Sequence, residues 1–173
     1  MNRVNSITND FNRTIQEYKN GFGHLESNYW LGLSNTKYLT SQSLNERTLL
    51  RIEFKSVYLD EYFIEYDNFK LIGNDYELNI GKVTNSNLID LFSYQNGSKF
   101  TTFDQDNDME SKRNVAIEFN GGWWHSYYFG FCLTCNCLNF ETNIDTWYLY
   151  ESCRYSKYEY YTQVKMLIKP IRQ

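Results

Sequence analysis

Three aspartates at alternate positions, Asp104, Asp106 and Asp108, form the run of this sequence best suited to bind a hard cation. Carboxylates spaced in this way converge on one ion when the backbone loops around it, and Ca²⁺ prefers several oxygen ligands. The run is not an EF-hand, because Met109 and Val115 stand where that loop requires its glycine and its glutamate. The residues alone leave two interpretations open, a solvated acidic turn and a calcium site of another kind.

Four cysteines form the second candidate group, and three of them, Cys132, Cys135 and Cys137, lie close together ahead of Cys153. Such a cluster indicates disulfides in a secreted protein and a metal or redox site in a cytosolic one. Cys132-x2-Cys135 offers one pair of zinc ligands, but the other two cysteines make a poor second pair. In an extracellular protein, a Cys135–Cys137 bridge would be strained, so one member of the cluster is expected to reach Cys153. The remaining two could pair with each other across a strained turn, or one could link to a second chain.

The segment Gly121-Gly-Trp-Trp124 allows close backbone approach beside a large apolar surface. The favoured interpretation of the two tryptophans is a core pair on a tight bend. Signs of catalysis are few: the sequence has no Gly-rich phosphate loop, no GxSxG elbow and two histidines, His24 and His125. A Cys135–His125 nucleophile pair has the right residue types and no further support. The sequence therefore favours a protein that is not an enzyme.

Composition limits the partners. Of 173 residues, 42% are hydrophobic, enough for one domain with a core, and the 16 tyrosines within the 18% aromatic fraction favour a binding surface. The net charge of -4, without a run of Lys or Arg, argues against nucleic acid. No apolar stretch is long enough to span a membrane, and the first residues lack a signal peptide. A fragment, a lost N-terminus and an intracellular chain all stay open, while sequons at Asn12 and Asn96 permit glycosylation outside the cell.

Hydrophobic patterning predicts an α+β domain. A helix over 10–20 has Asn9 or Asp10 as its cap and Gly21 as its end. The further elements expected are a strand at 28–33, a helix at 34–41, and strands at 50–54, 62–71, 76–80 and 164–168. Strands at this spacing form an antiparallel sheet with helices outside it. From about residue 96 to 163 the pattern is irregular, as is typical of segments that bind ligands.

Seven segments, in the same order and spacing, resemble the fibrinogen C-terminal domain, the module of fibrinogen, ficolins, angiopoietins, tenascins and tachylectin-type lectins. The matching segments are DFNRTIQEYKNGFG at 10–23, NYWLGLSNTKYLTSQ at 28–42, LRIEF at 50–54, EYDNFKL at 65–71, YQNGSKFTTFDQDND at 94–108, GGWW at 121–124 and MLIKP at 166–170. The resemblance covers nearly the whole chain.

The resemblance implies one domain over residues 1–173 that lacks the small first subdomain of the family. A central sheet subdomain would cover 10–98, an irregular calcium- and ligand-binding subdomain 99–163, and a closing strand 164–170. By the family pattern, calcium is held by the carboxylates of Asp106 and Asp108 and by the backbone carbonyls of Glu110 and Lys112.

Two departures from the family pattern stand out. A disulfide of the family is lost, because Val115 and Tyr128 take the positions of its cysteines. The family pocket for acetyl groups uses a tyrosine and a histidine, which Phe119 and Phe129 replace here. The resemblance thus implies a ligand site lined by Phe119, Tyr128 and Phe129 that has little affinity for acetylated sugars. The nearby cysteines would supply a replacement bridge.

Together these features predict a secreted, extracellular glycoprotein that binds a glycan or protein in a calcium-dependent way, a lectin-like module of the kind used in innate immunity. The alternative is a structural or regulatory member that forms homo-oligomers and has lost the lectin pocket. A more distant alternative is an intracellular metal protein built on the cysteine cluster.

Overall fold

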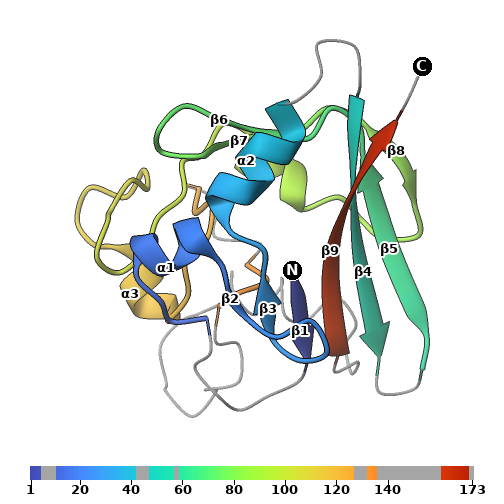
Figure 1. The fold of residues 1–173 in the computed structure, drawn as a ribbon, viewed down its shortest axis with the longest axis horizontal. Coiled ribbons are helices and arrows are strands. Elements are labelled where there is room, and N and C mark those ends of the chain that lie inside the picture. The colour runs from blue at the N-terminus through green and yellow to red at the C-terminus, as the bar shows by residue number, and fades with distance from the viewer. Residues whose placement is uncertain (5–10, 42–46, 57–58, 127–131, 136–160, 172–173) are drawn as a thin grey trace.

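A seven-stranded antiparallel sheet organises the computed structural model, which describes residues 1–4, 11–41, 47–56, 59–126, 132–135 and 161–171 (Figure 1). In spatial order its strands are β2 (Phe22–Gly23), β3 (Tyr29–Trp30), β1 (Asn2–Val4), β9 (Tyr161–Ile171), β4 (Arg47–Ser56), β5 (Glu61–Tyr66) and β8 (Val83–Ser86). The predicted α+β class with an antiparallel sheet is confirmed.

The centre of the sheet is the long pair β4–β9, which runs from Arg47 opposite Ile171 to Ser56 opposite Tyr161. The expected closing strand, 164–170, lies within β9, which pairs with β4 at the centre of the sheet. Leu50 and Ile52 alternate toward the core and are fully buried, whereas the residue between them faces outward. This period of two is what a half-buried strand requires.

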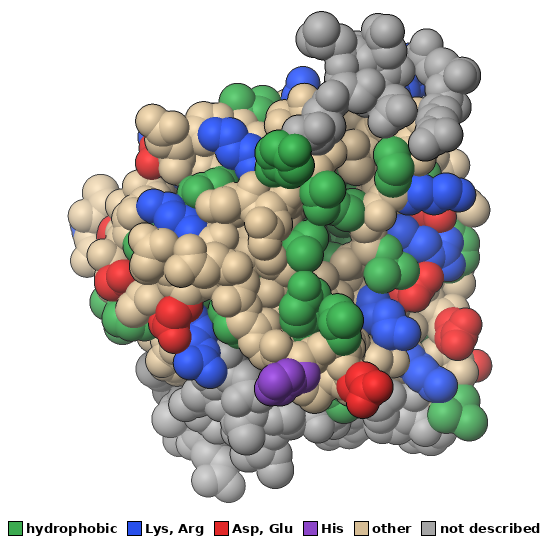
Figure 2. Space-filling model, viewed as in Figure 1, with side chains coloured by type: hydrophobic (Ala, Val, Ile, Leu, Met, Phe, Trp, Pro, Cys, Tyr) green, Lys and Arg blue, Asp and Glu red, His purple; other side chains and the backbone are tan. Residues whose placement is uncertain are grey.

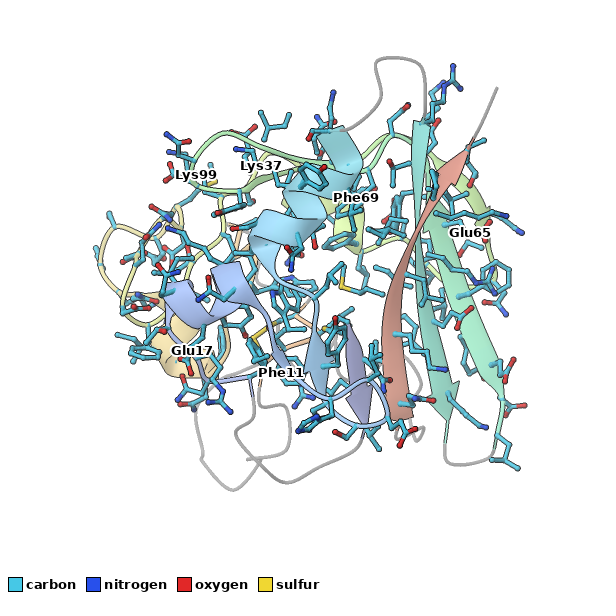
Figure 3. All side chains as sticks on the ribbon, viewed as in Figure 1. Phe11, Glu17, Lys37, Glu65, Phe69 and Lys99 are labelled. Atoms are coloured by element: carbon cyan, nitrogen blue, oxygen red, sulfur yellow. A yellow bond between two sulfur atoms is a disulfide. The ribbon has the colours of Figure 1, made fainter. Side chains whose placement is uncertain are left out.

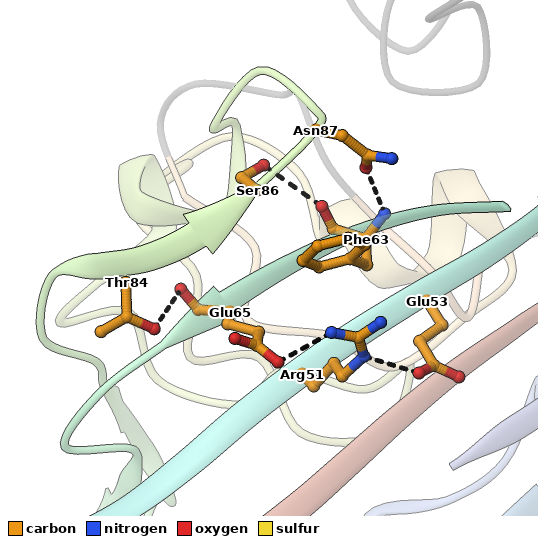
Figure 4. Close-up of polar contacts among 7 residues, drawn as sticks. All are labelled: Arg51, Glu53, Phe63, Glu65, Thr84, Ser86 and Asn87. Carbon is orange, nitrogen blue, oxygen red and sulfur yellow. Dashed lines mark hydrogen bonds and ion pairs between the residues drawn. The ribbon is translucent and has the colours of Figure 1, made fainter.

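The outer face of β4 and β5 carries a compact polar cluster (Figure 4). The Arg51 guanidinium donates to Glu53 at 2.6 Å and to Glu65 at 2.7 Å, and it lies 3.9 Å from the centre of the Phe63 ring. The backbone N–H of Phe63 donates to Asn87 at 2.7 Å, which ties β5 to the end of β8. One side of the sheet is thus polar and the other belongs to the core.

Helix α1 (Ile15–Asn20) begins later than the sequence prediction placed it. Thr14 is the N-cap and forms a capping box with Glu17, so the predicted start at residue 10 and the predicted cap, Asn9 or Asp10, are wrong. The sequence does contain this capping-box motif as Thr-x-x-Glu, but the apolar spacing that begins further upstream favoured an earlier helix start. The predicted end is confirmed: Gly21 has a φ of 92°, which favours glycine.

Helix α2 (Leu33–Ser41) matches its prediction, but the expected strand over 62–71 is in fact two elements. Strand β5 ends at Tyr66, and Asn68, with a φ of 52°, turns the chain into β6 (Lys70–Ile72). That strand pairs with β7 (Glu77–Asn79) in a separate hairpin, which accounts for the strand expected at 76–80. Asn tolerates the left-handed conformation, so a break there is physically reasonable.

The core fills the space between the sheet, the helices α1 and α2 and the loops beyond them (Figure 3). Its largest fully buried side chains are aromatic: Trp123, Trp124, Tyr18, Tyr66, Phe92 and Phe100. Phe92 begins the short 3₁₀ helix η1 (Phe92–Gln95), and the one-turn helix α3 (Val115–Phe119) lies beyond it in the sequence. Neither helix was predicted. The expected division into subdomains stays a prediction, although residues 2–4 also join the sheet.

Candidate functional site

The first aspartate of the acidic run fastens the run to helix α1. Asp104 Oδ1 accepts the backbone N–H of Ile15 at 2.9 Å and the hydroxyl of Thr102 at 2.7 Å. This carboxylate therefore satisfies one of the free N–H groups at the start of the helix. It holds the loop in place and leaves the other two aspartates to face one another.

Asp106 and Asp108 are brought together because the backbone curls around the second of them. Asp108 Oδ1 accepts the N–H of Glu110 at 2.8 Å, and its Oδ2 accepts the N–H of Val115, the first residue of α3, at 2.8 Å. Asp106 Oδ1 in turn accepts the N–H of Asp108 at 3.3 Å. Burial and then the negative charge of Asp108 raise the pKa of Asp106. A cation between the two would relieve that repulsion.

These residues fit a calcium ion by their donor chemistry. Carboxylate oxygens keep lone pairs after accepting one N–H each, and Ca²⁺ takes such oxygens together with backbone carbonyls. Within the described part of the chain, no further His, Cys, Asp or Glu side chain joins Asp106 and Asp108 in a group of metal-binding size. The rest of the ligand shell must then come from the backbone or water, as the predicted carbonyls of Glu110 and Lys112 would provide. This ligand set stays a prediction.

Two asparagines that sequence reasoning missed hold the acidic loop against the core. Asn107 donates through Nδ2 to the carbonyl of Phe100 at 2.8 Å, and its backbone N–H donates to Thr101 Oγ1 at 3.1 Å. Asn114 donates to the carbonyl of Thr102 at 2.9 Å and caps α3 with its side-chain oxygen. The second role was detectable, because Asn directly before an apolar helical run is a typical N-cap.

The double tryptophan is a core pair, as the sequence indicated. Trp123 and Trp124 are buried, and each indole N–H has a partner: Gln95 Oε1 at 2.7 Å and the carbonyl of Tyr76 at 2.7 Å. Trp123 also pairs its backbone with Thr101, next to the acidic run. The pair therefore anchors the acidic loop to the core, and as buried side chains the two tryptophans present no surface for a ligand.

The two glycines before the tryptophans are needed for space. A Cβ on Gly122 would lie 2.5 Å from the ring of Tyr18, and one on Gly121 would lie 2.6 Å from the carbonyl oxygen of Thr134. The Tyr18 hydroxyl donates to the carbonyl of Phe11 at 2.6 Å and accepts the N–H of Gly122 at 3.1 Å. Burial raises the pKa of this phenol, so it stays a neutral donor.

Cys132 and Cys135 form a buried disulfide, with Cα atoms 5.5 Å apart. Neither sulfur is then a thiolate, so the zinc pair and the Cys135–His125 nucleophile pair considered from the sequence are both wrong for this state. The imidazole of His125 is buried, Nε2 lies 3.1 Å from the carbonyl of Gly121, and burial lowers the pKa of the ring to about 4. The ring is therefore neutral at physiological pH.

The remaining cysteines, Cys137 and Cys153, lie outside the described residues. The expectation that one member of the cluster reaches Cys153 is excluded for Cys132 and Cys135, which bond to each other at a sequence separation of 3. It stays a prediction for Cys137. The strain expected for a Cys135–Cys137 bridge comes from the single residue between these cysteines. It does not extend to the C-x2-C spacing of Cys132 and Cys135, where a turn brings the side chains together.

Only one residue of the predicted ligand pocket can be placed. Phe119, at the end of α3, is half-buried with its ring centre 6.4 Å from that of His125. Tyr128 and Phe129 lie outside the described residues, so the pocket as a whole stays a prediction. Val115, which takes the place of a family cysteine, is buried in the first turn of α3.

A second apolar region lies between α2 and β9, where Figure 2 shows a strip of hydrophobic side chains down the middle of the face. The hollow there is lined by residues such as Leu33, Met166 and Ile168 and has a volume of about 40 Å³. That is well below the roughly 150 Å³ of an apolar cavity that holds benzene, so the hollow is too small for a sugar. None of the helices in the described residues is long and apolar enough to cross a membrane.

Comparison with known proteins places the chain in one family. The family model for the C-terminal globular domain of fibrinogen beta and gamma chains matches residues 1–171. Human ficolin-3 is 37% identical over 119 residues, which are 68% of this chain and 38% of ficolin-3. Human angiopoietin-related protein 2 is 38% identical over 119 residues, 68% of this chain and 23% of the relative. The chain thus spans well under half the length of these relatives.

Solved structures agree with the sequence comparison. The fibrinogen-like globe domain of human ANGPTL2 superposes with a TM-score of 0.73 at 27% identity, covering 98% of this chain and 77% of that domain. Lamprey fibrin D-dimer, solved with the peptide Gly-His-Arg-Pro-amide, gives a TM-score of 0.75 at 20% identity over 96% of this chain and 59% of that one, and so shares the fold. The resemblance seen in the sequence is confirmed: the chain belongs to the fibrinogen C-terminal domain family.

Proposed function

We propose that this chain is a calcium-stabilised extracellular recognition domain that binds a glycan or a protein and catalyses no reaction. The observation that carries the proposal is the pair Asp106 and Asp108, held together by backbone N–H groups although their charges repel. Such an arrangement is costly without a cation and favourable with one. Membership of a family that includes ficolin-3 and angiopoietin-related protein 2 supports the recognition role.

Calcium would act on the shape of the surface that meets the ligand. Asp108 bonds to the first N–H of α3, and Phe119 ends the same helix. An ion held by Asp106, Asp108 and the carbonyls of Glu110 and Lys112 would fix the loop and therefore the position of α3. The ion would hold the loop in one conformation by electrostatic attraction, and the glycan or protein ligand would contact the side chains of the domain and not the ion.

An extracellular location is supported by the buried disulfide, since such bonds persist in oxidising compartments. The ligand is proposed to bind mainly through apolar and aromatic contacts. Phe119 has no polar group with which to pair an acetyl oxygen, and a site without that pairing discriminates poorly for the acetyl group.

A titration of N-acetylglucosamine into the full chain, followed by NMR with calcium and with chelator, tests the ligand class. We expect weak or absent binding to this sugar, together with calcium-dependent, saturable binding to a panel of immobilised glycans and matrix proteins. Tight, acetyl-dependent binding would show that Phe119 and Phe129 are wrongly assigned to the pocket.

The structural, oligomerising alternative is favoured by the same lack of a polar group at Phe119. Sedimentation of the chain in calcium separates the two functions. A monomer that binds members of the panel supports recognition, whereas a stable homo-oligomer without panel binding supports the alternative.

A further inference from the structure

Three buried side chains that no proposed function uses lie together behind the double tryptophan. A ring nitrogen of His125 and the sulfurs of Cys132 and Cys135 all lie within 4.8 Å of one another. We propose that reduction of the Cys132–Cys135 disulfide creates a zinc site, with the two thiolates and the His125 imidazole as its three protein ligands. The site is separate from the acidic loop, which offers oxygen ligands suited to a harder cation.

The spacing of the three ligand atoms suits the metal. Zn–S bonds of about 2.3 Å and Zn–N bonds of about 2.0 Å at tetrahedral angles place ligand atoms roughly 3.5–3.8 Å apart. The sulfurs, bonded at 2.00 Å in the disulfide, reach that separation by rotation of their side chains. Cys-x2-Cys is the spacing that structural zinc sites commonly use, and the Cα atoms are already 5.5 Å apart.

Hydrogen bonds around the three side chains are those that a zinc site requires. The N–H of Cys135 donates to Cys132 Sγ at 3.0 Å, and the Thr134 hydroxyl lies 3.5 Å from the same sulfur. The backbone N–H of Cys135 is a donor of the kind that stabilises a thiolate, whereas the Thr134 hydroxyl gives its one proton to the carbonyl of Gly122. Because the carbonyl of Gly121 only accepts, the Nε2 that contacts it at 3.1 Å carries the hydrogen, which leaves Nδ1 with its lone pair. Histidine ligands of metals are oriented by this type of bond to a carbonyl.

The turn that carries the cysteines is held by bonds that do not involve sulfur. Arg3 donates to the carbonyls of Leu133 at 2.8 Å and Cys135 at 2.6 Å, and the Thr134 hydroxyl donates to the carbonyl of Gly122 at 2.6 Å. These contacts survive reduction. The two thiols would therefore stay beside His125 instead of separating, and the site would be largely formed before the metal arrives.

A dithiol can serve as the reductant of the Cys132–Cys135 disulfide. Thiol–disulfide exchange transfers two electrons and two protons to the Cys132–Cys135 bond, giving two thiols, and the reductant leaves as its own cyclic disulfide. Zinc then replaces the two thiol protons, which pass to solvent. Three protein ligands leave a fourth tetrahedral position for water.

Cobalt and zinc titrations of the full chain test the proposal. The protein is reduced with a phosphine, freed of reductant without air, and titrated with Co²⁺ in excess Ca²⁺ so that the acidic loop is occupied. We expect one equivalent to bind with a thiolate-to-cobalt charge-transfer band, which one equivalent of Zn²⁺ abolishes by displacement. The untreated, oxidised chain should show no such band.

Variants separate this site from the remaining cysteines. Cys137→Ser with Cys153→Ser should keep the band and the zinc affinity, whereas His125→Gln should weaken zinc binding roughly tenfold or more. If His125→Gln does not fold, Cys135→Ser replaces it and should lose about half of the band intensity. An equal band in oxidised protein, or loss of the site in the Cys137/Cys153 variant, would overturn the proposal.

Discussion

Two regions of this molecule are held together in different ways. The sheet region is the seven-stranded sheet, and its longest strands, β4, β5 and β9, form a continuous backbone ladder with alternating apolar residues. The loop region, residues 99–126 and 132–135, depends on side chains that bond to the backbone, among them Asp104, Asp108, Asn107 and Asn114. In the sheet region, stability is distributed over many equivalent backbone hydrogen bonds. In the loop region, each of these side chains makes hydrogen bonds that no other side chain replaces. Single polar substitutions should therefore cost more in the loop region.

The largest effect is expected where the two regions meet. The Trp124 ring lies 6.2 Å from that of Trp30 on β3 and 5.0 Å from that of Phe100 in the loop region. Trp124→Ala should lower the free energy of unfolding by about 3–5 kcal/mol. Urea unfolding measures this free energy. The control is Leu167→Ala, at an exposed position of β9, which should change the free energy of unfolding by less than about 0.5 kcal/mol. Equal effects of the two would show that the regions do not share one core.

A pH effect of similar size is expected in the oxidised, metal-free protein. Burial lowers the pKa of His125 to about 4, against about 6.5 in the unfolded chain. The unfolded state then binds more protons between these values, so stability falls as the pH drops from 6.5 to 4, by about 3 kcal/mol in all. The difference between wild type and His125→Gln over this range isolates the contribution. The same slope in both proteins would contradict a buried neutral ring.

A buried hydroxyl on α1, that of Tyr18, bonds to the backbone of the loop region. Tyr18→Phe leaves the carbonyl of Phe11 and the N–H of Gly122 without their partner, which should cost about 1–3 kcal/mol. Tyr38→Phe, at a side chain that is 63% exposed, is the matched control and should be nearly neutral. Thermal unfolding of both variants compares them directly, and a neutral Tyr18→Phe would remove this hydroxyl from the account.

The smallest effect is expected on the outer face of the sheet region. Arg51→Lys keeps the charge but loses the fork that reaches both Glu53 and Glu65, and should cost about 0.5–1 kcal/mol, less at high salt. Arg47→Lys, at the exposed start of β4, should change little. A cost above that of Tyr18→Phe would reverse the ranking of the two regions.

The sheet region could be predicted better than the loop region for physical reasons. Alternation at Leu50 and Ile52 is a local signal, and it gave the central strand. Strands β1, β2 and β8 are two to four residues long, too short for a local pattern to mark them, and each exists through its pairing with another strand. The break at Asn68 depends on one residue with positive φ, which the apolar pattern alone hides.

The sequence predicted the charged residues of the candidate site but not the residues that hold them in place. Asp106 and Asp108 were found because alternate carboxylates are a visible motif. Asn107 was missed because its bond to Phe100 joins a loop to the core, which sequence spacing does not reveal. The Cys132–Cys135 bridge was not singled out, because three clustered cysteines and Cys153 leave several pairings open and the spacing does not reveal the turn that brings these two together.

Thermal melting of the full chain with calcium and with chelator tests the central claim most directly. At a hundredfold excess over its dissociation constant, bound calcium stabilises the fold by about 2.7 kcal/mol, which should raise Tm by about 5–10 °C. Asp106→Asn and Asp108→Asn should each abolish that rise, whereas Glu26→Gln, which removes an exposed carboxylate elsewhere, should keep it. A wild-type Tm that is the same with calcium and chelator would contradict the account.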